Sequence, residues 1–185
     1  MRIIALIPAK GKSNRLKNKN IYPLSGKPLL AWTLDAAKKS KYIHETYVST
    51  ESEDVKAVAR ENGALIIDRP EPLTKDSVGK QQVIEHALSI LEKEKPVDII
   101  CLLQANSPQI ETEKIDEAIE KVAHPLSQTW DCISINKNTL FTDGAIRVFR
   151  RRVVDDCGVG MYKSIILTDY IDVHYKEDIE KIKKG

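Results

Sequence analysis

Apolar and polar positions along the chain alternate between two periods, which predicts strands and helices in succession. Two runs, at residues 2–8 and 97–103, are almost continuously apolar, which is typical of strands buried on both faces of a parallel sheet. Shorter strand-like runs are predicted at 45–49, 64–67, 131–135, 145–149 and 163–168. Apolar residues at helical spacing predict helices at 28–39, 52–62, 77–91, 112–122 and from 176 onward. This alternation predicts an α/β fold with a Rossmann-like mixed, mostly parallel sheet and helices on both faces.

Composition sets further bounds. A chain of 185 residues is long enough for one domain with a full core, so we expect residues 1–185 to form a single domain. The net charge of +2 is too small to predict a nucleic-acid partner. No apolar run approaches the roughly 20 residues of a membrane helix, and no membrane partner is expected.

Three widely spaced cysteines show no metal-ligand spacing. Cys101 and Cys132 lie in strand-like runs and are predicted to be small core residues, whereas Cys157 lies near a glycine-rich turn. This cysteine usage, with no leader-like opening, predicts a reducing, cytoplasmic location.

A basic loop follows the first apolar run. Residues 9–20 contain one glycine and five cations. The cations are Lys10, Lys12, Arg15, Lys17 and Lys19. Such a loop at the carboxyl end of a buried strand is where α/β proteins hold phosphates, and its cations would repel one another unless an anion binds. The loop therefore predicts an anionic ligand, such as a triphosphate or a nucleotide, although it matches neither the P-loop nor the dinucleotide fingerprint.

Two other polar groups are candidates. Residues 104–108 (Q-A-N-S-P) follow the second buried run, and their carboxamides could bind a base or a ribose; a polar turn ended by proline is an equally good interpretation. Asp172 and His174 would share one face of a strand and could hold a cation, although an exposed strand face is the simpler interpretation of these residues alone.

The loop carries a resemblance to a known family. Residues 7–21, I-P-A-K-G-K-S-N-R-L-K-N-K-N-I, resemble the opening of the sugar-acid cytidylyltransferases. These are the acylneuraminate cytidylyltransferases (CMP-sialic acid synthetases), with ketodeoxyoctonate cytidylyltransferase as a relative. Similar segments follow in order: L-S-G-K-P-L at 24–29, V-S-T at 48–50, L-L-Q-A-N-S-P at 102–108, G-A-I at 144–146 and I-D-V-H at 171–174. The resemblance covers nearly the whole chain.

The resemblance implies a fold of the nucleotide-diphospho-sugar transferase type. It also implies an enzyme that transfers CMP from CTP to a sialic-acid-like or other 2-keto sugar acid and releases pyrophosphate. By resemblance, Lys10, Lys19 and Asp172 would be catalytic, and Asp172 with His174 would hold Mg²⁺ or Mn²⁺. The residues implied in nucleotide binding are Ala9, Gly11, Ser13, Arg15, Asn20, Gln104 and Ser107.

The chain departs from the family pattern at several places. Lys10 replaces an arginine, and Gly79–Lys80 replaces a pair of small hydroxyl residues. His174 replaces a second carboxylate, which weakens the implied metal site or shifts its preference from Mg²⁺ toward Mn²⁺. The family's dimerisation arm is essentially missing, because only residues 136–143 separate the flanking segments. A homodimer would therefore lack the usual swapped arm.

Two alternatives remain open. The chain could be a non-catalytic CTP-binding homologue with a regulatory or partner role, which His174 and the missing arm favour. It could also transfer another base, as guanylyl- and uridylyltransferases of the same broad fold do. Their usual openings, L-A-G-G or L-A-A-G followed by G-x-R-M, are absent, so this alternative ranks lowest.

Overall fold

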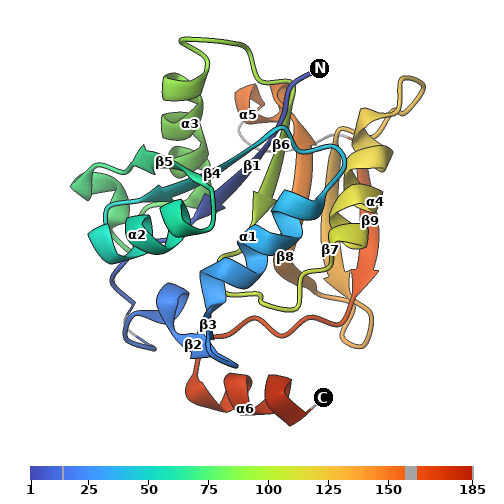
Figure 1. The fold of residues 1–185 in the computed structure, drawn as a ribbon. Coiled ribbons are helices and arrows are strands. Elements are labelled where there is room, and N and C mark those ends of the chain that lie inside the picture. The colour runs from blue at the N-terminus through green and yellow to red at the C-terminus, as the bar shows by residue number, and fades with distance from the viewer. Residues whose placement is uncertain (14, 157–161, 185) are drawn as a thin grey trace.

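A seven-stranded sheet forms the centre of the protein (Figure 1). The computed structural model describes residues 1–13, 15–156 and 162–184. The strands are β1 (Ile3–Pro8), β4 (Glu45–Thr50), β5 (Leu65–Asp68), β6 (Ile99–Leu103), β7 (Asp131–Asn136), β8 (Thr142–Arg150) and β9 (Lys163–Thr168). They lie in the order β5-β4-β1-β6-β8-β7-β9, and only β8 runs antiparallel to its neighbours. The predicted mixed, mostly parallel sheet is confirmed.

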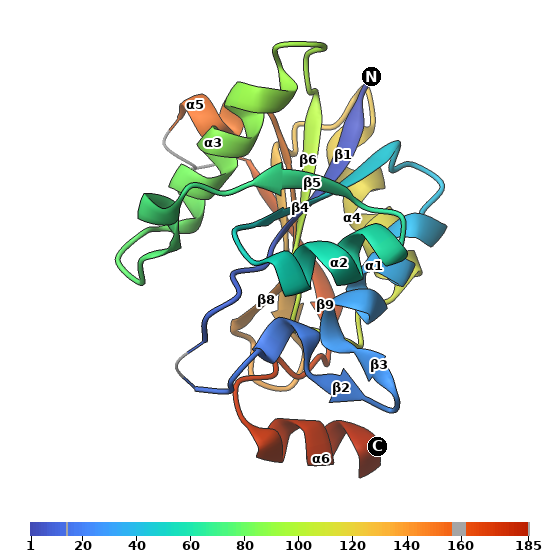
Figure 2. The same ribbon diagram turned by 60° about the vertical axis from the view of Figure 1, so that its left-hand side comes forward.

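Helices cover both faces of the sheet, as predicted (Figures 1 and 2). One face carries α1 (Leu29–Lys39), α2 (Glu53–Glu61) and α4 (Thr112–Ala123), and the other carries α3 (Lys80–Leu91) and α5 (Arg152–Asp155). The remaining elements are α6 (Lys176–Lys184), the 3₁₀ turns η1 (Lys19–Ile21) and η2 (Glu71–Thr74), and a hairpin of β2 (Pro23–Leu24) and β3 (Lys27–Pro28). None of the helices in the described ranges is both long and apolar enough to cross a bilayer.

The continuous apolar run of β1 is explained by its two covered faces. Ile3 and Ile7 pack with α1, α2 and α4, whereas Ile4 and Leu6 pack with α3 and α5. Because successive side chains of a strand point to opposite faces, both sets must be apolar. Cys101 and Cys132 are buried free thiols in strands, as predicted, and Cys157 lies outside the described residues.

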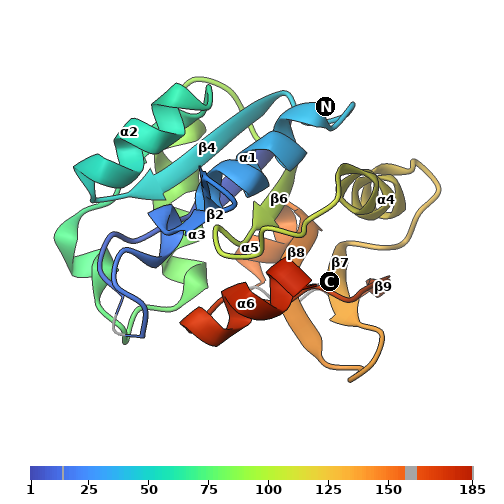
Figure 3. The same ribbon diagram turned by 60° about the horizontal axis from the view of Figure 1, so that its bottom comes forward.

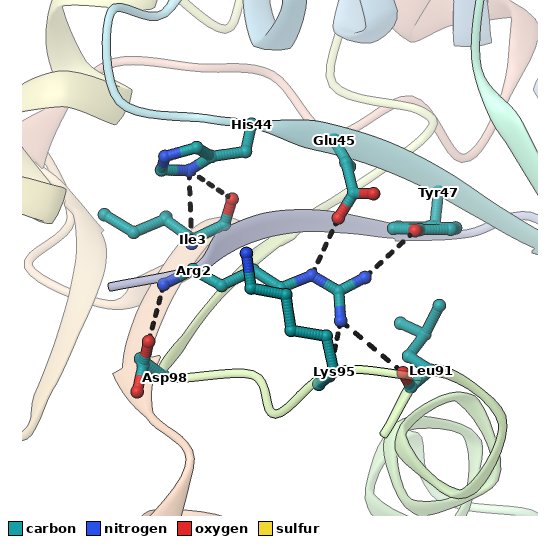
Figure 4. A network of polar contacts seen from close by, with 8 residues as sticks. All are labelled: Arg2, Ile3, His44, Glu45, Tyr47, Leu91, Lys95 and Asp98. Carbon is teal, nitrogen blue, oxygen red and sulfur yellow. Dashed lines mark hydrogen bonds and ion pairs between the residues drawn. The ribbon is translucent and has the colours of Figure 1, made fainter. Parts of the chain in front are cut away.

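Arg2, at the start of β1, forms hydrogen bonds with β4 and with the end of α3 and the segment that follows it (Figure 4). Its side chain is 7% exposed. The guanidinium donates to the Glu45 carboxylate (2.8 Å), the Tyr47 hydroxyl (3.2 Å) and the carbonyls of Leu91 (3.4 Å) and Lys95 (2.5 Å). A charge this deeply buried is tolerated because acceptors surround it, so Arg2 links β1 and β4 to the end of α3.

One edge of the sheet gathers the predicted polar segments. The parallel strands β1, β4, β5 and β6 all end there, the antiparallel β8 begins there, and α6 lies across this edge (Figure 3). The strand expected at residues 171–174 is wrong, because these residues form an irregular segment that leads into α6. β7 and β8, where the family arm would be inserted, are joined by residues 137–141 alone.

Candidate nucleotide-binding site

The loop that follows β1 is held against the end of β4. The amide of Ala9 donates to the Ser49 carbonyl (3.0 Å), and the amide of Gly11 donates to the Glu51 carboxylate (2.8 Å). A Cβ added at Gly11 would lie only 2.5 Å from the Ser52 Cβ. A larger residue at position 11 therefore does not fit unless the loop or the start of α2 shifts.

This loop lines a cavity of about 240 Å³, which we call the basic cavity. The residues of its wall used below are Lys10, Ser13, Lys19, Asn20, Lys80 and Gln104. Lys10 forms an ion pair with Asp76, which belongs to the segment before α3 and lines the same cavity. Asn20 is nearly buried, and its Nδ2 donates to the Lys10 carbonyl (2.9 Å). The backbone beneath the Lys10 side chain is thus fixed from within the loop.

The cations of the basic cavity are electrostatically crowded. Burial lowers the pKa of Lys19; the Asp172 carboxylate acts in the opposite direction, and the charge of Lys80 lowers it further. Burial also lowers the pKa of Lys80, again opposed by Asp172. By whole-residue area Lys80 is exposed, so this shift reflects protein atoms around its ammonium group and not burial of the entire side chain. A cluster of this kind attracts anions.

Asp172 is oriented by three side chains. Its Oδ1 accepts hydrogen bonds from Asn106 Nδ2 and from Ser107 Oγ (3.3 Å), and its Oδ2 lies 3.0 Å from His174 Nε2. Arg15 Nη1 lies 3.3 Å from His174 Nδ1. A guanidinium can only donate, so Nδ1 is the acceptor and the imidazole proton lies on Nε2, from which it is donated to Asp172. Burial raises the pKa of Asp172, and its neighbours, first among them His174, oppose this shift.

The donors around Asp172 fit a divalent cation held by one carboxylate. Three of the roughly four lone-pair sites of a carboxylate are engaged, which leaves room for one metal bond. Both ring nitrogens of His174 are engaged in the arrangement above, so it does not fit as a ligand there. Across the described ranges, no three His, Cys, Asp or Glu side chains gather where they could hold an ion. Mg²⁺ commonly combines one or two carboxylates with substrate phosphates, and Asp172 meets that minimum.

A second cavity of about 380 Å³ lies beside the first, and we call it the β8 cavity. The residues of its wall used below are Lys80, Asp131, Ile133, Gly144, Arg147 and Lys163. Arg147 grips the buried Asp131 carboxylate with two nitrogens, at 2.9 and 2.7 Å. Its guanidinium is thereby held at the wall of the cavity.

Gly144, in the wall of the β8 cavity, lies next to two residues of the basic cavity. A Cβ placed on Gly144 would lie 3.3 Å from Gln104 Nε2 and 3.9 Å from Lys80 Nζ. Gly144 also has a φ of +71°, which glycine adopts without strain. A glycine at this position therefore leaves space in which Gln104 and Lys80 approach the junction.

The predicted nucleotide-binding and phosphate-binding residues fall into two groups in the structure: residues that line the basic cavity and residues that lie behind it or contact its neighbours. Those that line the basic cavity are Lys10, Ser13, Lys19, Asn20 and Gln104. Ala9 and Ser107 are buried, the amide of Gly11 is used by Glu51, and Arg15 contacts His174. These four support the loop or Asp172 in the structure. The nucleotide-binding role of both groups stays a prediction.

Sequence reasoning assigned no site role to Arg69 or Lys80, which also line the basic cavity. Arg69 is buried, and its guanidinium donates to the Ser49 carbonyl (2.6 Å) and hydroxyl (3.2 Å). The signal for Lys80 was its place beside Gly79 in a segment where the resembled family carries small hydroxyl residues.

A mostly parallel sheet that gathers cations and a carboxamide at the carboxyl ends of its strands is typical of α/β proteins that bind nucleotides. More particularly, the chain belongs to the cytidylyltransferase family, whose sequence profile matches residues 4–144. It is 40% identical over 119 residues to an N-acylneuraminate cytidylyltransferase from Escherichia coli O18:K1:H7. That match covers 64% of this chain and 28% of the relative. Matches to the first curated relatives span between 27% and 53% of their length.

Solved structures share the fold over the whole chain. A CMP:2-keto-3-deoxy-manno-octonic acid synthetase complexed with CTP superposes with a TM-score of 0.77 at 14% identity, and the match covers 100% of this chain and 98% of that one. A Mycobacterium tuberculosis protein in complex with manganese gives 0.72 at 16% identity, with 100% of both chains covered. At such low identities these two show the fold alone, and they confirm the predicted nucleotide-sugar transferase type.

Proposed function

We propose that this protein transfers the cytidylyl group of CTP to a hydroxyl group of a 2-keto sugar acid and releases pyrophosphate. The observation that carries the proposal is the pair of adjacent cavities, which share Lys80 and adjoin one another near Gly144. One cavity presents cations suited to a triphosphate. The other presents Arg147 and Lys163, which suit an acidic acceptor. Family membership and the names of the relatives support cytosine as the base.

The reaction needs alignment and charge neutralisation more than covalent help from the protein. The acceptor oxygen forms a bond to the α-phosphorus, and the bond from that phosphorus to the bridging oxygen breaks. Pyrophosphate leaves with the electron pair, and the acceptor proton passes to water. Lys10 and Lys19 neutralise the departing pyrophosphate from the wall of the basic cavity, and Gln104 holds the acceptor beside the α-phosphate.

A divalent cation, Mg²⁺ or Mn²⁺, would be held by Asp172 and completed by oxygens of the triphosphate. When bound, it supplies positive charge to the phosphates. The manganese bound by one structural relative supports this assignment. In this chain Asn106, Ser107 and His174 fix the direction of the carboxylate, so the loss of any of them is expected to weaken metal binding through Asp172.

The β8 cavity suits an acceptor larger than a simple hydroxy acid. Its volume of about 380 Å³ lies within the range of about 300–1,000 Å³ that small-molecule sites occupy. Lys163 and the fixed guanidinium of Arg147 favour a carboxylate among the acceptor's groups. Because residues 137–141 are too short to form an arm, we infer that any homodimer completes its contacts through another surface.

Pyrophosphate release from CTP tests the proposal. The assay uses Mg²⁺ or Mn²⁺ and a panel of 2-keto sugar acids, with ATP, GTP and UTP in parallel. We expect release only when CTP and an acidic sugar are present together. If CTP binds in a titration but no acceptor gives pyrophosphate, a non-catalytic CTP-binding homologue is the better description. If GTP or UTP is preferred, the assignment of the base is wrong.

A further inference from the structure

Lys80 occupies a position that no other described residue shares, because it alone lines both the basic cavity and the β8 cavity. It is the first residue of α3 and follows the N-cap Gly79. Its Nζ lies 3.9 Å from the point that a Cβ on Gly144 would occupy. The ammonium group therefore projects toward the place where a nucleotide in one cavity meets an acceptor in the other.

Asp172 acts on Lys80 through its charge, but no group among the described residues bonds directly to the ammonium group. Within residues 1–13, 15–156 and 162–184, its ammonium group makes no hydrogen bond and no ion pair. The first turn of α3 contains no acidic residue, and a cation at the amino end of a helix is opposed by the helix dipole. A lysine at this position therefore interacts unfavourably with the helix dipole when no ligand is bound. An anion bound beside the lysine would offset that unfavourable interaction.

We propose that Lys80 binds the α-phosphate of the nucleotide and neutralises its charge during transfer to the acceptor. The inference rests on the proposed function. The α-phosphorus is the atom that the acceptor attacks, so it must lie where the cavities meet. Lys10 and Lys19 line the basic cavity and not the β8 cavity. We therefore assign them to the β- and γ-phosphates, which leave as pyrophosphate.

The charge balance of the site explains why a lysine is useful at this position. The resembled family pairs two carboxylates, whereas this chain has Asp172 beside the imidazole of His174. A single carboxylate attracts a divalent cation less strongly than a pair of carboxylates does. The Lys80 ammonium group adds a fixed positive charge at the junction and requires no second carboxylate.

Binding of cytidine, CMP and CTP separates the roles of the lysines without any need for an acceptor. The variants are Lys80→Gln, Lys80→Arg, Lys10→Gln and, as a surface control, Lys93→Gln, each titrated calorimetrically after its melting temperature is checked. We expect Lys80→Gln to weaken the binding of CMP and of CTP by the same factor, roughly 10- to 150-fold, as for a lost hydrogen bond to a charged group. Cytidine should bind unchanged. Lys80→Arg should stay close to the wild type, and Lys10→Gln should weaken CTP much more than CMP.

The outcomes distinguish this inference from the proposed function. Unchanged CMP binding by Lys80→Gln overturns the role of Lys80 even if the protein is an active transferase. A loss of CMP binding in that variant, together with no pyrophosphate release from any acceptor, leaves Lys80 as a phosphate ligand and refutes the transferase. In an active enzyme we expect Lys80→Gln to lower kcat. A raised KM for the acceptor with unchanged kcat would instead assign Lys80 to the acceptor's carboxylate and overturn the proposal.

Discussion

Replacement of single lysines in the basic loop tests whether the loop is a shaped site or only a region of positive charge. Lys19 lies in the wall of the basic cavity, partly buried, and is electrostatically coupled to Asp172. Lys12 lies in the same loop and is exposed. The two residues carry the same charge, so Lys19→Ala and Lys12→Ala form a matched pair.

The structure sets the expected sizes of the two effects. Lys19 would lose a hydrogen bond to a charged phosphate, worth about 1.5–3 kcal/mol, which is roughly a 10- to 150-fold loss of CTP affinity. Its removal would also leave Asp172 less neutralised and more repulsive to the triphosphate. Lys12 acts through solvent, where a pair of charges is worth about 1 kcal/mol or less, so its loss should be about fivefold at most.

The assay is a calorimetric titration of CTP without divalent cation, first at low salt and then near 0.15 M. The Lys12→Ala effect should shrink with salt, since screening acts over about 8 Å at that ionic strength, and the Lys19→Ala effect should largely persist. Equal losses for the two variants, with equal salt dependence, would refute the assignment of Lys19 and show that the loop is only a diffuse basic patch.

Three further predictions concern the framework and the protonation of the site. Arg2→Met should lower the free energy of unfolding by about 3 kcal/mol, the low end for breaking a buried ion pair, because Glu45 remains partly hydrated; urea unfolding against Arg60→Met checks it, and equal midpoints would contradict it. Gly11→Ala should lower the melting temperature and CTP affinity together, and a second change, Ser52→Gly, should restore both by removing the Cβ that the added methyl group would strike; failure of this rescue would mean that the contact is not the cause. Because burial lowers the pKa of Lys19, CTP affinity should fall with rising pH earlier than for an ordinary lysine near 10.4, and this early fall should be absent in Lys19→Ala.

The sheet could be predicted because the buried strands are visible as apolar runs in the sequence itself. In β1 and β6 both faces are covered, so their apolar runs are continuous and identify central strands. The helix predicted at 52–62 begins with Ser52, a residue type that favours the N-cap position, and its hydroxyl accepts the Val55 amide in the structure (3.5 Å). These are local signals, and they can be read before any tertiary contact is known.

Residues 169–175 are a segment whose conformation could not be predicted from local sequence patterns. The sequence I-D-V-H has strand-like alternation, yet the segment is irregular. Its conformation comes from distant partners, because Asn106 donates to the Asp172 carboxylate and accepts from the Val173 amide (3.0 Å). Asp172 and His174 do lie together as predicted, but through this tertiary clamp and not through strand periodicity.

The sequence marks Lys80 as a departure from the family pattern, but it could not reveal a role for this residue, for a related reason. Its significance depends on Gly144 and Asp172, which lie far from it along the chain and reach it only through the fold. Read alone, a lysine at the start of a helix is an ordinary solvated residue. Together with His174 and the short 137–141 connection, Lys80 is one of several departures from the family's sequence pattern that lie around the candidate site. Because Lys80 lines both cavities, its charge lies where the proposed transfer would need it. This position favours a redistribution of charge within the site over a simple loss of the site.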